Sequence, residues 1–310
     1  MKKVSIIGNG YHTNKNLLHA ISNDKDFKIN KVYSDVSKNY DNKYYKYLSK
    51  EIEKDTPNLL VLSTPPSSHL EILQNLIKIK IPIVIEKPFS NSFENVKKML
   101  EIINTNQMNV IEGLMYLHHP FASNLKSILK NEEVKKIEAN FTIPFPEKNN
   151  FRIESKFDGG SLLDTGVYIF SLLHFLGGDN FTLKDLVLKN NLESKGTINS
   201  NVNNFKFTGS WGFGKYSNNL KIATTSHLYE FEYFFSKPIT KRHIINIYKN
   251  QKLIDSKDFS ENNHFILMYI NFLNDYKKET FSYENYNNIL SRWKLIDKAQ
   301  NMILEKKLLK

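Results

Sequence analysis

The sequence predicts an α/β fold: an N-terminal Rossmann dinucleotide-binding domain followed by a C-terminal α+β domain with a large, mostly antiparallel open sheet. Strand and helix signals alternate over the first 120 residues, and a Gly8-Asn9-Gly10 turn follows the first strand. The pattern changes near Pro120, and beyond one more helix the chain turns to strand signals that follow one another without helices between them. We therefore expect a first domain over 1–119 and a substrate-binding and oligomerisation domain over 120–310, whose last helix can pack back on the first.

Apolar runs bounded by turn residues define the expected elements of each domain. In the first domain, Leu17, Leu18 and Ile21 at helical spacing place a helix after the glycine turn, and further helices are expected near 68–79 and 92–105. The expected strands are 4–7, 29–34, 59–63, 81–85 and 109–112. In the second, helices are expected over 262–277 and 286–308, and strands over 137–143, 181–188, 205–211, 220–226, 228–235 and 244–248.

Aromatic residues are frequent in the strands of the second domain. If no helix covers their face of the sheet, this face is an interaction surface. The residues concerned are Trp211, Phe213, Tyr229, Phe231 and Tyr233.

Composition narrows the class of protein. The chain has 310 residues, a net charge of +11 and no cysteine, so disulfides, thiol catalysis and thiolate zinc sites are excluded, and we expect no metal. Its lysines are scattered, which argues against a nucleic-acid partner, although a positive field attracts anionic ligands. We expect no membrane partner and a cytoplasmic location, because no apolar run reaches about 18 residues and strand 4–7 begins directly after Met1-Lys2-Lys3.

The turn after the first strand is an imperfect dinucleotide fingerprint. Two glycines permit a tight turn and the close approach of a pyrophosphate to a helix N-terminus, whereas Thr13 replaces the third glycine. The residues expected to bind the cofactor here are Gly8, Asn9, Gly10, Tyr11 and His12.

Asp35 ends the second strand, where a carboxylate can bind the ribose 2′-hydroxyl and repel a 2′-phosphate. This favours NAD over NADP, and nearby Lys38 weakens the preference.

The segment from Ser63 to His69 follows the third strand, and we expect it to cover the nicotinamide half of the cofactor. The alternative is a rigid Pro-Pro turn with a serine cap and a surface histidine. The residues assigned to the cofactor are Ser63, Thr64, Pro65 and His69.

Glu86-Lys87-Pro88 ends the apolar strand 81–85, at the edge where open α/β sheets bind ligands. Taken alone, such a motif is more often a solvated turn lysine than a catalytic one. Asp164 and Tyr168 are four residues apart, so they share one face of a helix, for which the alternative is a capped core helix.

Together these motifs resemble those of the Gfo/Idh/MocA oxidoreductase family. The resemblance rests on the glycine turn, the Ser-Thr-Pro-Pro loop, Glu86-Lys87-Pro88 and the segment from Gly159 to Tyr168, in that order along nearly the whole chain. The segment 111–120, the Phe151-Arg152 pair and a tyrosine at 168 are similar to the branch of nucleotide-sugar 3-ketoreductases and dihydrodiol dehydrogenases.

The resemblance implies an NAD(P)-dependent oxidoreductase that acts on a sugar. It makes Lys87 and Tyr168 catalytic, with Tyr168 as the proton donor, and Asp164 a residue that orients the substrate. Glu86 would hold Lys87 and contact the cofactor, and the alternative is a surface carboxylate at the end of the strand. Arg152 would bind a substrate phosphate, and the expected lining of the substrate pocket is Tyr116, His118 and His119. The alternative for the two histidines is that they only mark the crossover between the domains.

Several points stay open on sequence alone. Thr13 and Asp35 depart from the family pattern, so the cofactor is NAD or NADP. The substrate is a nucleotide-linked 3-keto-sugar or, alternatively, a free sugar, an inositol or a diol. A third alternative is a protein of another class, a regulator that binds a dinucleotide without catalysing a reaction. The resemblance further implies a homodimer or homotetramer formed through the C-terminal sheet.

Overall fold

The computed structural model describes the chain except residues 35–41, 148–150, 154–158, 190–191, 237–240 and 309–310. Two compact units form it. The first contains Met1–Leu114 and Asn263–Leu290, and the second contains Met115–Asn262 and Ser291–Lys310. Each unit thus combines two separate stretches of the chain.

The first unit is built on a five-stranded parallel sheet with the order β2-β1-β3-β4-β5. Strands β3 and β4 are short runs that are buried throughout, as expected where helices cover both faces of a parallel sheet. The strands are β1 (Lys2–Ile7), β2 (Phe27–Tyr33), β3 (Leu59–Leu62), β4 (Ile83–Glu86) and β5 (Val110–Gly113).

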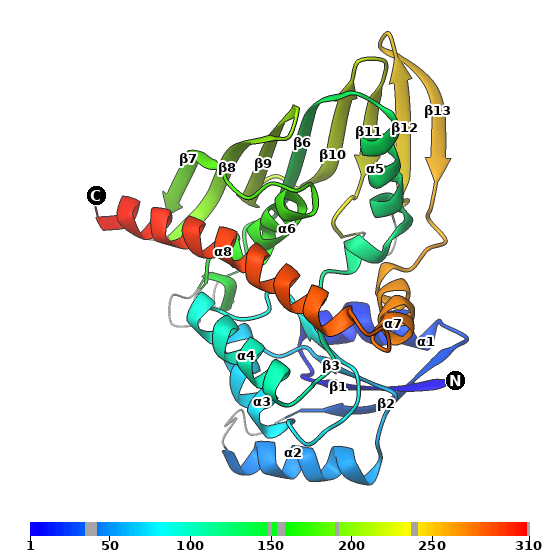
Figure 1. Cartoon of the computed structure of the whole chain (residues 1–310), viewed down its shortest axis with the longest axis vertical. Helices are drawn as coiled ribbons and strands as arrows, with labels where there is room; N and C mark the ends of the chain where they lie inside the picture. The colour runs from blue at the N-terminus through cyan, green and yellow to red at the C-terminus, as the bar shows by residue number, and fades with distance from the viewer. Residues whose placement is uncertain (35–41, 148–150, 154–158, 190–191, 237–240, 309–310) are drawn as a thin grey trace. The chain divides into compact units, whose positions relative to one another are not determined.

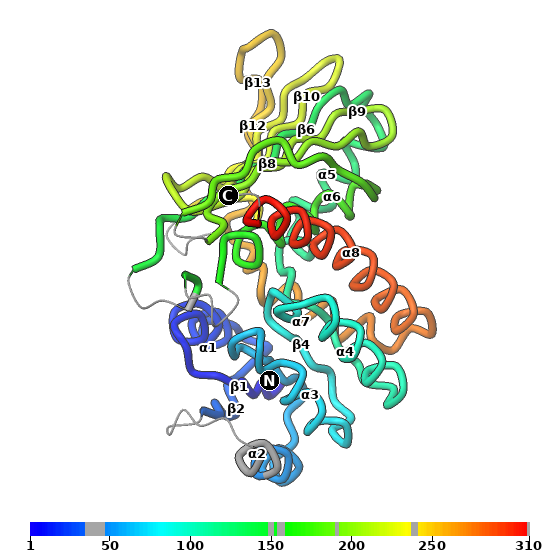
Figure 2. The backbone as a smooth tube through the Cα atoms, turned by 90° about the vertical axis from the view of Figure 1, so that its left-hand side faces the viewer, coloured from blue at the N-terminus to red at the C-terminus, as the bar shows by residue number. Residues whose placement is uncertain are grey.

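Helices connect the strands of this sheet and cover it (Figure 2). The first connection contains the π-helical turn η1 (Thr13–Leu17) and α1 (Leu18–Ser22). The others are α2 (Asn42–Lys54), the short turn η2 (Pro66–Ser68), α3 (His69–Asn75) and α4 (Phe93–Thr105), and from the end of the chain come α7 (His264–Asp275) and the start of α8 (Phe281–Leu308).

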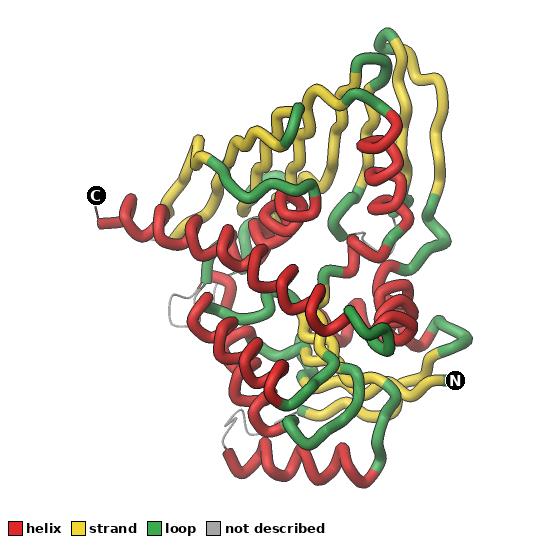
Figure 3. Tube along the Cα trace, viewed as in Figure 1, coloured by secondary structure: helices red, strands yellow, loops and turns green. Residues whose placement is uncertain are grey.

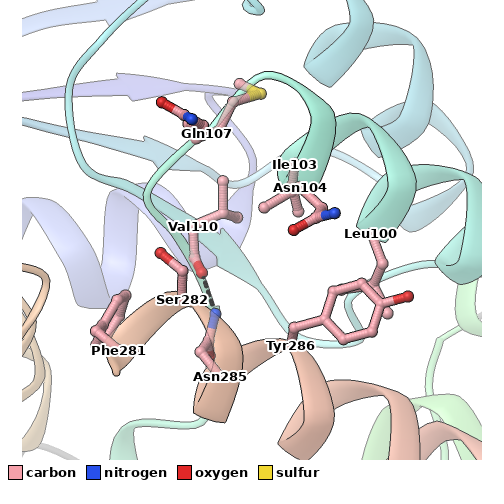
Figure 4. A pocket seen from close by; sticks show the side chains of 10 residues that line it. Leu100, Ile103, Asn104, Gln107, Val110, Phe281, Ser282, Asn285 and Tyr286 are labelled. Carbon is pink, nitrogen blue, oxygen red and sulfur yellow. Dashed lines mark hydrogen bonds between the residues drawn. The ribbon is translucent and has the colours of Figure 1, made fainter. Parts of the chain in front are cut away.

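The start of α8 lies along the outer edge of β5. Asn285 Nδ2 donates a 2.5 Å hydrogen bond to the carbonyl oxygen of Val110, so this edge carbonyl is paired (Figure 4). A cavity of about 90 Å³ lies beside this contact, with Leu100 and Tyr286 among its lining residues (Figure 4). It lies at the amino end of β5, away from the carboxyl ends of the strands.

The second unit is built on an eight-stranded sheet with the order β13-β12-β11-β10-β6-β9-β8-β7 (Figure 1). Its neighbours are antiparallel except β6 and β9, which confirms the prediction of a mostly antiparallel sheet. The strands are β6 (Val134–Ile143), β7 (Thr182–Lys189), β8 (Leu192–Val202), β9 (Phe205–Phe213), β10 (Ser217–Thr224), β11 (Leu228–Glu232), β12 (Ile244–Lys249) and β13 (Lys252–Asp258).

Helices α5 (Pro120–Asn131) and α6 (Val167–Phe175) lie on one face of this sheet (Figure 3). Phe121 of α5 packs on Phe231, and Phe170 of α6 packs on Trp211, with ring centroids 5.2 and 5.5 Å apart. Of the aromatic residues proposed for an uncovered face, Trp211, Phe213, Tyr229 and Phe231 are buried within this unit. The condition for an interaction surface is therefore not met for these four residues, because helices cover their face.

The opposite face of the sheet carries hydroxyl and amide side chains that bond across strands. Thr197 and Ser210 lie 3.1 Å apart, and Thr208 donates to Asn199 over 3.0 Å. On the neighbouring strands, Asn140 donates to Asn219 over 3.2 Å. This face is polar rather than aromatic.

Three elements have no counterpart among the predicted ones: α2, β8 and β13. Short helical turns complete the second unit, at η3 (Met115–His118), η4 (Phe151–Ile153) and the π-helical η6 (Leu162–Gly166). Within the described residues, no helix is long and apolar enough to cross a membrane.

Candidate functional site

The predicted site residues form two sets, one in each unit. The first set surrounds the glycine turn at the carboxyl ends of β1, β3 and β4. Gly8 has a φ of +106°, and a Cβ at this position would lie 2.4 Å from the carbonyl oxygen of Ser63, so only glycine fits. A Cβ at Gly10 would have no heavy atom within 4 Å, so the backbone is open on that side.

Thr13 explains how the turn tolerates the loss of the third glycine. Its side chain is buried, and its Oγ1 lies 3.0 Å from both the carbonyl oxygen of Gly8 and the hydroxyl of Ser63. The threonine therefore ties the glycine turn to the end of β3. A glycine at this position would have neither bond.

The other residues of the turn are held by side chains one helical turn later. Asn14 Nδ2 donates to the carbonyl oxygen of Asn9 and to its side-chain oxygen, at 3.2 and 2.9 Å. The exposed Tyr11 accepts a hydrogen bond from Lys15 Nζ at 2.5 Å. Asp35 and Lys38, which carry the argument for NAD, lie outside the described residues.

His69 is buried, so it is not the surface residue of the alternative interpretation. Its Nδ1 lies 3.1 Å from the carbonyl oxygen of Phe89, and its Nε2 lies 3.0 Å from that of Thr64. Burial lowers the pKa of His69, and these two carbonyl oxygens oppose that shift. His69 thus joins the loop after β3 to the segment that follows Lys87.

Glu86 ends β4 and is buried. Its carboxylate lies against the Cα of Gly113, where a Cβ would come within 3.3 Å of Oε2. Among the described residues, Oε1 has no hydrogen-bond partner, although His12 Nε2 lies 3.5 Å away. The half-buried Lys87 follows directly, and its peptide bond to Pro88 is cis.

This set of residues fits a dinucleotide. The glycine turn leaves its backbone open at the start of a helix, where a pyrophosphate can be bound. Among the described residues, the buried atoms Glu86 Oε1 and His12 Nε2 have no hydrogen-bond partner, and both lie at the same edge of the sheet. Gly8, Gly10, His12 and Glu86 are therefore the residues that would hold such a cofactor. Among the described residues, no three His, Asp or Glu side chains cluster as metal ligands.

The second set lies around η6 and α6. Arg152 Nε lies 2.9 Å from Oδ2 of Asp164, which is 11% exposed. Arg152 also meets the start of this helix through its backbone, because its carbonyl oxygen accepts a 2.8 Å bond from Gly160 N. The structure thus brings together two residues that the sequence assigned separately. Asp158 lies outside the described residues.

Tyr168 is buried at the start of α6. Its hydroxyl lies 3.6 Å from the sulfur of Met115, and its ring packs on Phe141 and Tyr116, with centroids 5.0 and 5.9 Å away. The hydroxyl of Tyr116 lies 2.7 Å from that of Ser171, one turn further along α6. Tyr116 therefore supports the helix that carries Tyr168.

The two neighbouring histidines differ in their surroundings. His119 is buried and caps α5, because its Nδ1 accepts a 3.2 Å hydrogen bond from Phe121 N. Its ring lies 4.1 Å from that of His243, between centroids. His118 is half-buried at the end of η3. His119 thus stabilises the start of α5, and its lining of the substrate pocket stays a prediction.

Sequence reasoning missed Glu193, a buried carboxylate of β8 that contacts the start of η6. It lies in a stretch with no chemical motif and no apolar alternation, so nothing in the sequence marks it. Thr13 was noticed only as a departure from the glycine pattern.

Comparisons with known proteins agree with this geometry. Residues 2–114 match the GFO_IDH_MocA model, an oxidoreductase family with an NAD-binding Rossmann fold. The chain is similar to a dTDP-3,4-didehydro-2,6-dideoxy-α-D-glucose 3-reductase from Streptomyces violaceoruber, with 22% identity over 141 residues, 44% of this chain and 41% of that protein. It is also similar to a glucose-6-phosphate 3-dehydrogenase from Bacillus subtilis, with 25% identity over 63% of this chain and 59% of the relative. The first match thus spans only about two fifths of the relative's length.

Solved structures share the fold over almost the whole chain. A 3-ketoreductase from Actinomadura kijaniata, solved with NADP and TDP-benzene, has a TM-score of 0.76 at 17% identity and 96% coverage of both chains. An aldose-aldose oxidoreductase from Caulobacter crescentus has a TM-score of 0.79 at 12% identity and 98% coverage of both. Residues 2–114 thus match the Gfo/Idh/MocA oxidoreductase family, and the solved structures share the fold over almost the whole chain.

Proposed function

We propose that this chain is an NAD(P)-dependent oxidoreductase that acts on a carbonyl or hydroxyl carbon of a sugar, with a nucleotide-linked 3-keto-sugar as its substrate. The observation that carries the proposal is the position of Lys87. It directly follows the buried Glu86 at the carboxyl end of β4, beside a glycine turn that fits a dinucleotide. The matched 3-reductases of dTDP-linked sugars support the choice of substrate class.

The nicotinamide supplies or accepts the hydride, and the side chains of the chain manage the oxygen of the reacting carbon. During reduction, negative charge develops on this oxygen, and the Lys87 ammonium would stabilise it. Tyr168 would donate the proton, and the same ammonium would stabilise the phenolate that remains. Glu86 would hold Lys87 in place.

The second unit would bind the sugar. Asp164 would orient the substrate, with Arg152 as the residue that fixes its carboxylate, since their charged groups are 2.9 Å apart. Arg152 remains our candidate for a substrate phosphate, and His118 and His119 remain candidates for the lining of the pocket. Tyr116 would act there through its support of α6.

For the cofactor, we propose use of either NAD or NADP, with NAD preferred because of Asp35. NADP is present in the solved 3-ketoreductase, which supports a nicotinamide dinucleotide but not the preference.

We further propose a cytoplasmic protein that forms a homodimer or homotetramer through the polar face of the large sheet. Sedimentation of the wild-type chain and of Ser210→Arg tests this contact, and a monomeric wild type would contradict it.

A substrate panel tests the function. NADH and NADPH oxidation should be measured with a dTDP-linked 3-keto-sugar, and the reverse reaction with glucose 6-phosphate, inositol and a diol. We expect the highest kcat/KM with the nucleotide-linked sugar. A higher value with glucose 6-phosphate would move the substrate to sugar phosphates, the class named for the Bacillus subtilis relative. Tight cofactor binding without turnover of any substrate would favour the non-catalytic regulator.

Two variants test the residue roles. Lys87→Ala and Tyr168→Phe should each lower kcat by about 100-fold or more and leave the dissociation constant of NAD(P)H within about twofold. The matched controls are Lys97→Ala and Tyr283→Phe, because Lys97 is 53% exposed in α4 and Tyr283 is 74% exposed in α8. Full activity of both site variants would disprove the assignment.

A further inference from the structure

Glu193 of β8 is a carboxylate that is only 4% exposed and accepts three hydrogen bonds. Its Oε1 accepts one from the hydroxyl of Ser161 and one, 3.0 Å long, from Trp211 Nε1. Its Oε2 accepts one from the backbone N–H of Leu162 at 3.1 Å. Burying a carboxylate costs free energy unless hydrogen-bond donors surround it, and these three donors compensate that cost for Glu193.

Two of the three donors belong to the start of the helical segment that carries Asp164 and Tyr168. Ser161 occupies the N-cap position, but its side chain caps no backbone N–H of its own helix. Glu193, which lies on strand β8, caps the helix instead by accepting the hydrogen bond of a backbone N–H. Its negative charge also suits the positive end of the helix dipole. The start of η6 is therefore fixed by the sheet and not by its own sequence.

Three glycines lie against Glu193 or Trp211 and leave the space that their side chains occupy. Gly160 has a φ of +143°, and a Cβ there would lie 2.6 Å from Glu193 Oε2. A Cβ at Gly196 or Gly166 would lie 2.1 or 3.1 Å, respectively, from the indole of Trp211. The carboxylate and the indole thus occupy the space that these glycines leave between the start of the helix and strands β8 and β9.

We propose that Glu193 is a positioning residue, which fixes the helical start at Ser161 and Leu162 and thereby the placement of Asp164 and Tyr168. It acts through these backbone and hydroxyl contacts, without touching the substrate. The catalytic consequence rests on the proposed function, whereas the control of the helix start does not.

The charge on Glu193 has identifiable determinants. Burial raises its pKa, and the bonds from Ser161, Leu162 and Trp211 oppose this shift. The charged side chain that acts on it from α8 is Lys307. If Glu193 is protonated, one of its oxygens becomes a donor, and the Ser161 hydroxyl is the partner that can accept. The indole of Trp211 bonds to that same oxygen, so its emission reports the change.

The first test needs neither substrate nor cofactor. Hydrogen exchange should be compared between the wild type, Glu193→Gln and Ser161→Ala. We expect amide exchange over 161–168 to accelerate about tenfold in Glu193→Gln, because one acceptor becomes a donor, and less in Ser161→Ala. Exchange in β9 should stay unchanged. Equal acceleration in both segments, or none in 161–168, would overturn the proposal.

A spectroscopic test isolates the Trp211 contact. The chain has two tryptophans, so Trp293→Phe leaves Trp211 as the only indole. Its emission should change with pH around a midpoint above the ordinary glutamate value of 4.5. The change should be absent when Glu193→Gln is added. The same titration in both proteins would show that Glu193 does not control this site.

Kinetics then test the catalytic consequence. Glu193→Gln should lower kcat about tenfold or more, since small misplacements of reacting groups are costly, and leave NAD(P)H affinity unchanged. The control is Glu138→Gln, a strand carboxylate of β6 that is 44% exposed. Unchanged kcat despite faster exchange over 161–168 would refute the positioning role. If the wild type turns over no sugar, the proposed function fails, and the exchange and emission results still decide the control of the helix start.

Discussion

His12 Nε2 lies 3.5 Å from Oε1 of Glu86, and this contact connects the glycine turn after β1 with the residue that precedes Lys87. Each atom is buried and has no hydrogen-bond partner among the described residues. On its other side, His12 Nδ1 accepts a 3.0 Å hydrogen bond from Asn16 Nδ2, and the ring meets the edge of Phe265. The imidazole is thus held in place on two sides and directed at Glu86 on the third.

A double-mutant cycle should show coupling between these two side chains. We expect His12→Ala and Glu86→Gln to lose less stability together than the sum of the single losses, with an interaction energy of about 1 kcal/mol. Urea unfolding of the four proteins measures it. Asn16→Ala combined with Glu86→Gln is the control, because Asn16 contacts the other ring nitrogen. Additivity in the His12 cycle would show that the contact carries no energy.

The hydroxyl of Thr13 should contribute more to stability and cofactor binding than the volume of its side chain. Thr13→Val keeps the volume and removes both contacts, to Gly8 and to Ser63, so we expect a loss of about 1–2 kcal/mol in the free energy of unfolding and weaker NAD(P)H binding. Thr13→Ser keeps the hydroxyl and should stay near the wild type in both measurements. If Thr13→Val binds the cofactor as tightly as Thr13→Ser, the bridge to β3 does not shape the turn.

Local patterns predicted the elements around the cofactor turn well. The apolar strands of the first sheet lie within a few residues of their expected bounds, because a buried parallel strand is a short apolar run between turn residues. The same rule failed for β8 and β13. All seven residues of β13 are exposed, so no alternation marks it, and β8 carries the buried polar Glu193 and Ser194.

The sequence allowed the individual residues of the site to be predicted, but not the side chains that contact them. Motif spacing singled out Asp164, whereas its contact with Arg152 joins two residues that no motif pairs. The support of η6 by Glu193 joins residues 31 and 32 positions apart through a strand that was not predicted. Long-range contacts of this kind leave no periodic signal in the sequence.

The two glycines of the turn should respond differently to alanine. In Gly8→Ala, the Cβ would meet the Ser63 carbonyl and the φ of +106° would be strained, so we expect loss of both stability and NAD(P)H affinity. In Gly10→Ala, the Cβ meets no protein atom, so the thermal midpoint should hold and only cofactor affinity should fall. Thermal unfolding and NAD(P)H titration separate the two. Normal cofactor affinity in Gly10→Ala would place the pyrophosphate elsewhere.

His69 should make the stability of the protein depend on pH. Burial lowers its pKa from the ordinary value of 6.5, so below about that pH the unfolded chain takes up a proton that the folded chain does not. The free energy of unfolding should therefore fall on acidification, with a contribution from His69 of up to ~1.4 kcal/mol per pH unit. Urea unfolding between pH 7 and 5 measures this slope.

The difference between variants assigns the slope to this side chain. His69→Gln removes the titrating group and keeps an amide that can donate to the carbonyl oxygen of Phe89 or Thr64, so its stability should vary less with pH than that of the wild type. His19→Gln is the control, because His19 is exposed on α1 and should leave the slope unchanged. An equal slope in His69→Gln and the wild type would mean that the folded and unfolded chains bind the same number of protons at His69, so that burial does not lower its pKa.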